Sequence, residues 1–142
     1  MSESDKKRVK LLNRQQLKIM KHSTNRHVIQ KRRIEKIRSR IHGTKIRPRL
    51  SLYRSNNHLE AQVIDDTVGK TLCAVHDRLL KGVKPAKGQT KNIAAAHALG
   101  ILLAEKAKAK KIIDVVFDRR GAKYHGRVRA FAEGARAGGL NF

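Results

Sequence analysis

The apolar residues of this chain change their spacing at Pro48, and this change limits where a folded domain can form. Residues 1–46 hold 15 basic residues, three acidic residues and no aromatic residue, so this segment cannot bury enough apolar surface to fold alone. Pro48 favours extended backbone at the residue before it, and strand-like alternation follows at once. We therefore divide the chain into a basic N-terminal arm, residues 1–46, and a globular domain, residues 47–142.

Part of the arm has the pattern of a helix. Ile34, Ile37 and Ile41 recur at helical spacing among arginine and lysine residues, which predicts a basic amphipathic helix ending near Gly43. The alternative is a basic coil in water. We expect the arm to become ordered only when it binds a polyanion, because its apolar surface is too small to order it alone.

The first half of the domain has the pattern of an antiparallel meander. Apolar and polar residues alternate over residues 50–53 and 59–63, on either side of the turn-forming sequence Ser-Asn-Asn. This predicts a hairpin with one apolar face. A second turn over residues 65–70 and a third strand over residues 71–76 complete the meander. Residues 77–89 contain two glycines and a proline, and we expect them to form a flexible basic loop.

The second half of the domain adds two helices and one strand. Residues 92–110 have helical spacing, and we expect Gly100 to allow a close approach of this helix to the sheet. The β-branched run over residues 112–117 predicts a buried strand inside the sheet rather than at its edge. A last helix carries Val128 and Phe131 and stops at Gly138-Gly139. The expected fold is a two-layer α/β sandwich with a small mixed sheet, in the order β-β-β-α-β-α.

The formal net charge of +23 predicts a polyanionic partner, and nucleic acid is the leading candidate. The longest nearly apolar run, residues 93–104, is shorter than the roughly 20 residues that cross a bilayer. Residues 1–7 include Glu3 and Asp5 and no apolar core, so they are typical of neither a secretory signal nor a transit peptide. We expect a cytoplasmic protein with no membrane partner.

The motifs of common enzyme sites are missing from the sequence. It has no phosphate-binding glycine loop, no HExxH motif and no GxSxG motif, and Cys73 is its only cysteine. The seven histidines do not have the spacing of metal ligands. We therefore expect no catalysis, no cofactor and no metal. Two other classes remain as alternatives: a metal-dependent nuclease that uses Asp66 and Asp118, and a protein that compacts DNA with its basic arm.

Residues 118–129 form the segment with the clearest binding chemistry. This strand-to-helix loop holds five arginine or lysine residues, two glycines and Tyr124, and it leads into a helix N-terminus that favours phosphate. Asp118 is expected to pair with Arg119 or to cap the helix. The alternative is a basic loop in water with Tyr124 packed against the domain.

Residues 47–58 form a second candidate segment. If Leu50 and Leu52 face the core, then Arg49, Ser51 and Tyr53 face away from it and present a cation, a hydroxyl and a ring. That combination suits looped or single-stranded RNA, whereas no recognition helix for duplex DNA can be identified. The alternative is that Tyr53 and the arginine after it lie along the sheet edge.

These two segments resemble a known family, bacterial-type large-subunit ribosomal protein eighteen. The similarity lies in RPRLSLYRSNNHLEAQVIDD at 47–66, GKTL at 69–72, VVFDR at 115–119 and KYHGRVRAFAEGAR at 123–136. Arg120 and Ala122 depart from the family pattern, which commonly has a glycine and an aromatic residue there. The resemblance implies a small α/β domain that binds 5S rRNA and helps attach it to the large-subunit, 23S-type rRNA in the central protuberance, beside neighbouring ribosomal proteins.

The RNA contacts predicted from both lines of reasoning lie in the arm and in the two segments. They are Arg32, Arg33, Arg38, Arg40, Lys45, Arg47, Arg49, Tyr53, Arg54, Ser55, Asn56, His58, Arg119, Lys123, Tyr124, His125, Gly126, Arg127 and Arg129.

Overall fold

The computed structural model describes residues 27–80, 82, 87–88 and 90–142 of the chain. Two units are distinguished, Met1–Glu35 and Lys36–Phe142, and each is described by itself. Residues 27–38 are helical, so the predicted arm helix is confirmed, although it ends before Gly43. Residues 36–46, which the sequence assigns to the arm, belong to the second unit.

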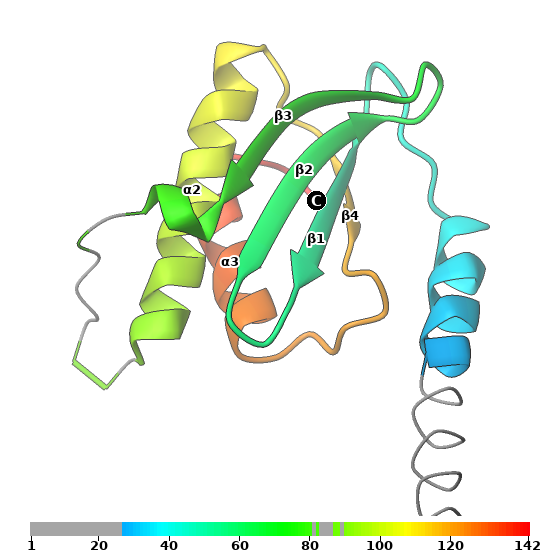
Figure 1. Cartoon of the computed structure of the whole chain (residues 1–142). Coiled ribbons are helices and arrows are strands. Elements are labelled where there is room, and N and C mark those ends of the chain that lie inside the picture. The colour runs from blue at the N-terminus through cyan, green and yellow to red at the C-terminus, as the bar shows by residue number, and fades with distance from the viewer. Residues whose placement is uncertain (1–26, 81, 83–86, 89) are drawn as a thin grey trace, which may run out of the picture. The chain divides into compact units, whose positions relative to one another are not determined.

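The second unit contains a four-stranded mixed sheet with the order β3-β2-β1-β4 (Figure 1). Strands β1 (Arg49–Arg54), β2 (Leu59–Asp65) and β3 (Lys70–His76) form the predicted antiparallel meander. Strand β4 (Val116–Asp118) pairs in parallel with β1.

The prediction that residues 112–117 form an interior strand is wrong. Only its last two residues belong to β4, which lies at the edge of the sheet beside β1. Val115 is fully buried, but Ile113 is 55% exposed. The β-branched run is apolar because Val115 and Phe117 contribute to the core, and not because strands flank it on both sides.

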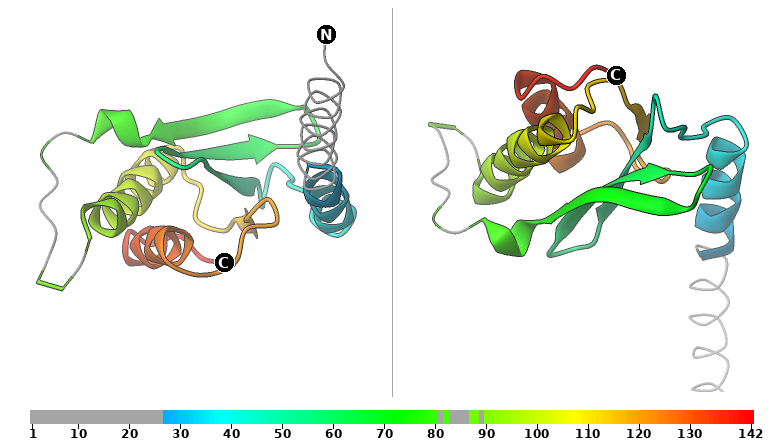
Figure 2. Two further views of the ribbon diagram at one scale, coloured as in Figure 1. Left: turned by 60° about the horizontal axis from the view of Figure 1, so that its bottom comes forward. Right: turned by 90° about the horizontal axis from the view of Figure 1, so that it is seen from above.

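Both long helices cover the same face of the sheet, as the two views of Figure 2 show. They are α2 (Lys91–Ala109) and α3 (Arg127–Ala137), and α3 ends at Gly138 as predicted. The core between the layers includes Leu50, Leu52, Leu103 and Phe131, all almost fully buried. The two-layer α/β fold is therefore confirmed. No helix in the described part of the chain is long and apolar enough to span a membrane.

Gly100 allows a close approach of helix to helix, and the predicted close approach of helix to sheet is wrong. A Cβ atom at Gly100 would collide with the backbone of α3 at Phe131 and Ala135. Gly134 makes the reciprocal approach, since a Cβ atom there would collide with the carbonyl group of His97 on α2. The two backbones therefore touch at glycines, where no side chain separates them.

Residues 77–89 are described only in part. Asp77–Leu79 form a short 3-10 helix directly after β3. The rest of the predicted flexible loop lies largely outside the described residues.

Candidate nucleic-acid interface

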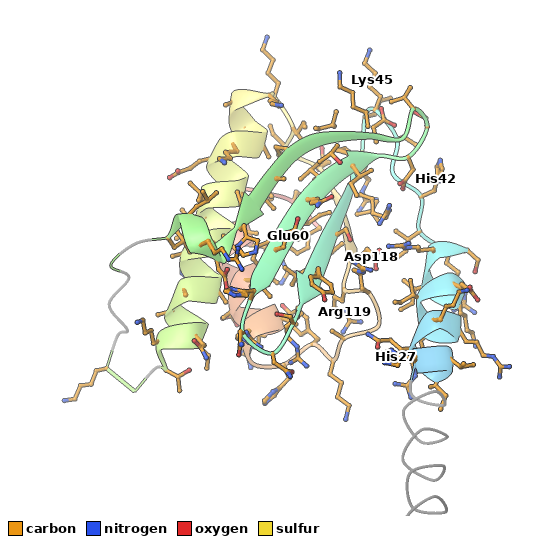
Figure 3. The ribbon with its side chains drawn as sticks, viewed as in Figure 1. His27, His42, Lys45, Glu60, Asp118 and Arg119 are labelled. Atoms are coloured by element: carbon orange, nitrogen blue, oxygen red, sulfur yellow. The ribbon has the colours of Figure 1, made fainter. Side chains whose placement is uncertain are left out.

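The fold brings the two candidate segments together on one surface. Strand β1, from the first segment, pairs with β4, from which the second segment continues. At the far end of β1, Nη2 of Arg127 donates hydrogen bonds to the carbonyl oxygens of Ser55 and Asn56, at 2.8 and 3.0 Å. Figure 3 shows Glu60 on β2 and Asp118 and Arg119 at the end of β4, on the two sides of β1.

Strand alternation divides β1 between the core and the opposite face of the sheet. Leu50 and Leu52 are buried under the helices, as predicted, and Tyr53 on the other face is 47% exposed. Arg49 and Ser51 also alternate away from the core, but each is only 8% exposed. The prediction that Arg49 presents its cation on an open face is therefore wrong.

The Arg49 guanidinium is held by two carboxylates. Its Nη2 and Nε donate to Asp66 at 2.7 and 2.8 Å, and its Nη1 donates to Oδ2 of Asp118 at 3.0 Å. The hydrogen bonds from Arg49 to Asp66 lower the pKa of that carboxyl from 3.8 to about 2. Arg49 thus joins the turn after β2 to the end of β4.

Asp118 pairs with Arg49 rather than with Arg119, which corrects the sequence-based expectation. Its side chain is fully buried, its Oδ2 also lies 3.6 Å from Nε of Arg38, and its Oδ1 accepts the backbone N–H of Arg120 at 2.8 Å. The charge of this carboxylate is therefore balanced inside the domain. It leaves the cations of the following loop available for a negatively charged ligand.

Two half-exposed tyrosine rings stand beside arginines on this surface. The guanidinium carbon of Arg120 lies 5.0 Å from the centre of the Tyr53 ring, and that of Arg119 lies 5.7 Å from the Tyr124 ring. Tyr124 is 41% exposed, and its hydroxyl accepts a hydrogen bond from Nη1 of Arg136 at 3.0 Å. Each ring is thus held in place by a cation and still partly open to stacking.

Two hollows flank these groups. One, of about 450 Å³, is on the open face of the sheet and is lined by Arg38, Ser51, Tyr53, Glu60, Gln62, Ile64 and Arg120. The other, of about 330 Å³, is lined by Ile37, Arg40, Ile41, Phe117, Arg119, Gly121 and Ala122. Arginines thus border both hollows, and Tyr53 borders the larger one.

The loop between β4 and α3 keeps a glycine-like backbone despite the arginine in it. Arg120 has a φ of 49° and Gly121 a φ of 76°, both in the left-handed region. Arg120 therefore holds a backbone conformation that favours glycine, at a cost in strain. The loop ends at Gly126, whose φ is 56°, and no described side chain caps the N-terminus of α3. That helix end keeps free amide groups for an anion.

The other predicted RNA contacts differ in how far their side chains are free to reach a ligand. Arg40, Lys45, Arg47, Arg54, Asn56, Lys123 and His125 are exposed in the second unit, and Arg32 and Arg33 are exposed in the first. Arg129 is exposed but pairs with Glu133 at 2.8 Å. Nδ1 of His58 lies 3.1 Å from Asp77, and the Ser55 hydroxyl accepts the backbone N–H of His58. These contacts hold the hairpin turn in shape.

Sequence reasoning misses two residues of this surface, Arg120 and Asp66. From the sequence, Arg120 is noted only because it replaces an expected glycine. In the structure its guanidinium lies over the Tyr53 ring, which places it on the candidate RNA-binding surface. Aspartate is common in turns, so the sequence suggests that Asp66 forms the turn after β2. In the structure Asp65 does so instead, because its side chain accepts the Thr67 amide N–H at 3.0 Å. The bond from Asp66 to Arg49 depends on strand register, which no local motif encodes.

The nuclease alternative has no geometric support. It requires Asp66 and Asp118 to hold a metal ion, but both carboxylates bind the guanidinium of Arg49. Among the described residues, the one group of three side chains close enough to share a metal ion is His58, His76 and Asp77, on another part of the domain.

Comparisons with known proteins agree with one another. A sequence profile described as ribosomal L18 of archaea, bacteria, mitochondria and chloroplast matches residues 13–142. The chain is 48% identical to the large ribosomal subunit protein uL18 of Lachnoclostridium phytofermentans, over 94% of this chain and 99% of that protein. It is 52% identical to the uL18 of Moorella thermoacetica, over 83% and 96% of the two chains.

Proposed function

The chain belongs to the ribosomal L18 family, and we propose that within the large ribosomal subunit it binds 5S rRNA and helps attach it to the large-subunit rRNA in the central protuberance. As a member of this family it is a structural component of the ribosome in the cytoplasm and not an enzyme. Its partners are rRNA and neighbouring ribosomal proteins. The choice of 5S rRNA and the central protuberance is the proposed part.

One observation carries the proposal: two partly exposed tyrosine rings, each beside an arginine, lie on a surface where Asp66 and Asp118 are already paired with arginines. Tyr53 and Tyr124 offer ring faces to unstacked bases, and exposed cations such as Lys123 can reach phosphates. Asp118 does not oppose this, because its charge is balanced by Arg49 and Arg38. A surface of this kind suits RNA that displays unpaired bases.

Duplex DNA is the less suitable ligand for this surface. Reading its major groove requires a protruding helix or a two-stranded ribbon, and α2 and α3 both pack against the sheet. Of the predicted contacts in the second unit, those with rings are at the end of β1, in the hairpin turn that follows it and in the loop before α3. These elements suit the irregular shape of folded RNA better than the regular grooves of DNA.

The experiment is competition binding with the purified full chain. Labelled 5S rRNA is displaced by unlabelled 5S rRNA, by an unrelated structured RNA of equal length and by duplex DNA, at one fixed salt concentration near physiological. We expect 5S rRNA to compete at least about ten-fold better than either of the others. Equal competition by the unrelated RNA contradicts specific 5S recognition, and better competition by the duplex favours a DNA-compacting protein.

A further inference from the structure

Three side chains from separate parts of the sequence meet at the end of the meander. His58 precedes β2, His76 is the last residue of β3 and Asp77 begins the short helix after it. The register of β2 and β3 places His76 opposite Glu60 and so brings it beside His58. The histidine spacing in the sequence does not predict a metal site, because this proximity depends on strand pairing.

The three side chains direct their polar atoms at one another. Oδ1 of Asp77 lies 3.1 Å from Nδ1 of His58 and 2.8 Å from Nδ1 of His76. The two imidazole centres are 5.3 Å apart with planes tilted by 48°. Each residue offers a ligand atom, and these atoms all lie within 4.8 Å of one another.

We propose that His58, His76 and Asp77 bind a divalent transition-metal ion, for which Zn²⁺ is the best-suited case. Two imidazole nitrogens and one carboxylate oxygen form a donor set that zinc accepts, with bonds of about 2.0–2.2 Å. In a tetrahedral zinc site with such bonds, neighbouring donor atoms are about 3.3 Å apart. The observed nitrogen–oxygen separations, 3.1 and 2.8 Å, need to open by only a few tenths of an ångström.

The backbone around the three residues holds the carboxylate in the orientation that a ligand needs. Oδ2 of Asp77 accepts the amide N–H of Leu59 at 3.0 Å, which leaves Oδ1 directed at the two imidazoles. A hydrogen-bonded partner of this kind orients a metal ligand and raises its affinity. The side chains of His58 and His76 are 43% and 33% exposed, so an ion can enter from solvent, and water can fill the fourth position.

Two existing hydrogen bonds must break when the ion binds, and the first is the one between Nδ1 of His58 and Oδ1 of Asp77. In the second, Nδ1 of His76 accepts the backbone N–H of Arg78 at 3.1 Å, and a metal ion at this nitrogen needs the same lone pair. Binding should therefore release the Arg78 amide while the Leu59 amide stays bonded. Loss of the Arg78 hydrogen bond with retention of the Leu59 hydrogen bond would therefore distinguish this site from non-specific binding of metal to surface histidines.

The test titrates ZnCl₂ into the tag-free, RNA-free full chain in a calorimeter, with MgCl₂ as the comparison ion. We expect one Zn²⁺ site that is weakened at least about ten-fold in His58→Gln, His76→Gln and Asp77→Asn. His42→Gln, which removes an exposed histidine outside the cluster, is the matched control and should leave this site unchanged. MgCl₂ should not compete, because Mg²⁺ prefers oxygen ligands.

A second readout is the amide NMR spectrum during the titration. The chemical shift of the Arg78 amide should change, and the Leu59 amide should stay protected from hydrogen exchange. Circular dichroism checks that each variant folds, and the His→Gln changes at half-exposed positions leave the core intact. If the Zn²⁺ site is absent, or equally tight in all three cluster variants, the assignment is overturned. This outcome is independent of RNA binding, because no RNA is present.

Discussion

Arg49 and Asp118, which are 69 positions apart in the chain, meet in a buried ion pair at 3.0 Å. The Asp118 side chain is fully buried and that of Arg49 is 10% exposed. The pair joins β1 to the end of β4, at the point where the loop with Arg119 and Arg120 begins. It therefore sets the position of the cations that we assign to RNA binding.

Replacing Arg49 should destabilise the domain strongly. Arg49→Met leaves Asp118 charged and buried without its main partner, and breaking such a pair typically costs about 3–5 kcal/mol. Urea unfolding followed by circular dichroism measures the change. Adding Asp118→Asn to Arg49→Met should recover part of the loss, because it removes the stranded charge. Arg129→Met breaks only an exposed pair with Glu133 and should change the unfolding free energy by less than about 1 kcal/mol.

Asp66 should make the stability of the domain sensitive to acid. Its pKa in the folded chain is about 2, below the usual 3.8, because Arg49 and the Gly43 amide bond the charged form. A lowered pKa adds stability above the unfolded-state value, and this stability is lost as the pH falls from about 4 towards 2. The contribution is on the order of 2 kcal/mol.

The measurement for Asp66 is the unfolding free energy as a function of pH for the natural chain and for Asp66→Asn. The natural chain should lose stability more steeply than the variant between pH 4 and pH 2. Glu133→Gln, at an exposed position on α3, serves as the control for removing a carboxylate. Parallel curves for Asp66→Asn and the natural chain would contradict the assignment.

Patterns that repeat locally allow most of the fold to be predicted. The alternation of Leu50 and Leu52 identifies β1 and its buried face, and the spacing of Val128 and Phe131 identifies α3. Contacts made between distant elements cannot be predicted in this way. The partner of Gly100 is a helix backbone, and the edge position of β4 depends on which strand it joins.

In the candidate site, too, features that depend on local sequence can be predicted and contacts between distant elements cannot. Tyr53 and Tyr124 are identified by residue type and by their place in a strand and a loop, and both rings are partly exposed. Arg49 has the residue type of a phosphate contact, but Asp66 and Asp118 bind it from two other elements. A single sequence does not reveal whether a cation faces solvent or a carboxylate, because that depends on strand register.

Enlarging Gly100 should separate the two helices. In Gly100→Ala the new methyl group meets the backbone of α3 at Phe131, which cannot move aside as a side chain can. We expect a loss of at least about 2 kcal/mol of unfolding free energy, although alanine is the better helix former. Thermal unfolding measures it. Glu105→Ala, at an exposed position of the same helix, should change stability by less than about 0.5 kcal/mol.

Removing the Tyr124 ring should weaken RNA binding without unfolding the domain. If the ring stacks on a base of 5S rRNA, Tyr124→Ala costs about 1–3 kcal/mol of binding free energy. Tyr124→Phe keeps the ring and loses only the hydroxyl that Arg136 bonds, so it should bind within about 1 kcal/mol of the natural chain. Filter binding at fixed salt measures both. If the folded Tyr124→Ala variant binds RNA as tightly as the natural chain, Tyr124 does not stack on a base and only packs against the domain.

The structure changes where the arm should be cut to test its role. The sequence places the boundary after residue 46, but Gly43 is buried and exchanges two hydrogen bonds with Asp66, at 2.8 and 3.0 Å. Arg38 also lies 3.6 Å from Asp118. A deletion of residues 1–46 would remove these contacts together with the arm. A cut between Glu35 and Lys36 retains Arg38 and Gly43 in the chain, so both contacts can still form.

Deleting residues 1–35 should reduce the salt dependence of RNA binding while the remaining domain keeps its fold and its thermal unfolding. The deleted segment holds eleven basic and three acidic residues, including Arg32 and Arg33. Each cation that meets a phosphate releases counterions, so the slope of log affinity against log salt should become shallower by roughly 0.7–0.9 for each phosphate that the deletion leaves without its cation. The affinity at low salt should fall as well.

Replacing residues 1–35 by a neutral Gly/Ser segment of equal length separates the effect of charge from that of chain length, and this variant should behave like the deletion. An unchanged salt slope in both variants would show that this part of the arm does not meet rRNA phosphates and would direct attention to a protein neighbour instead.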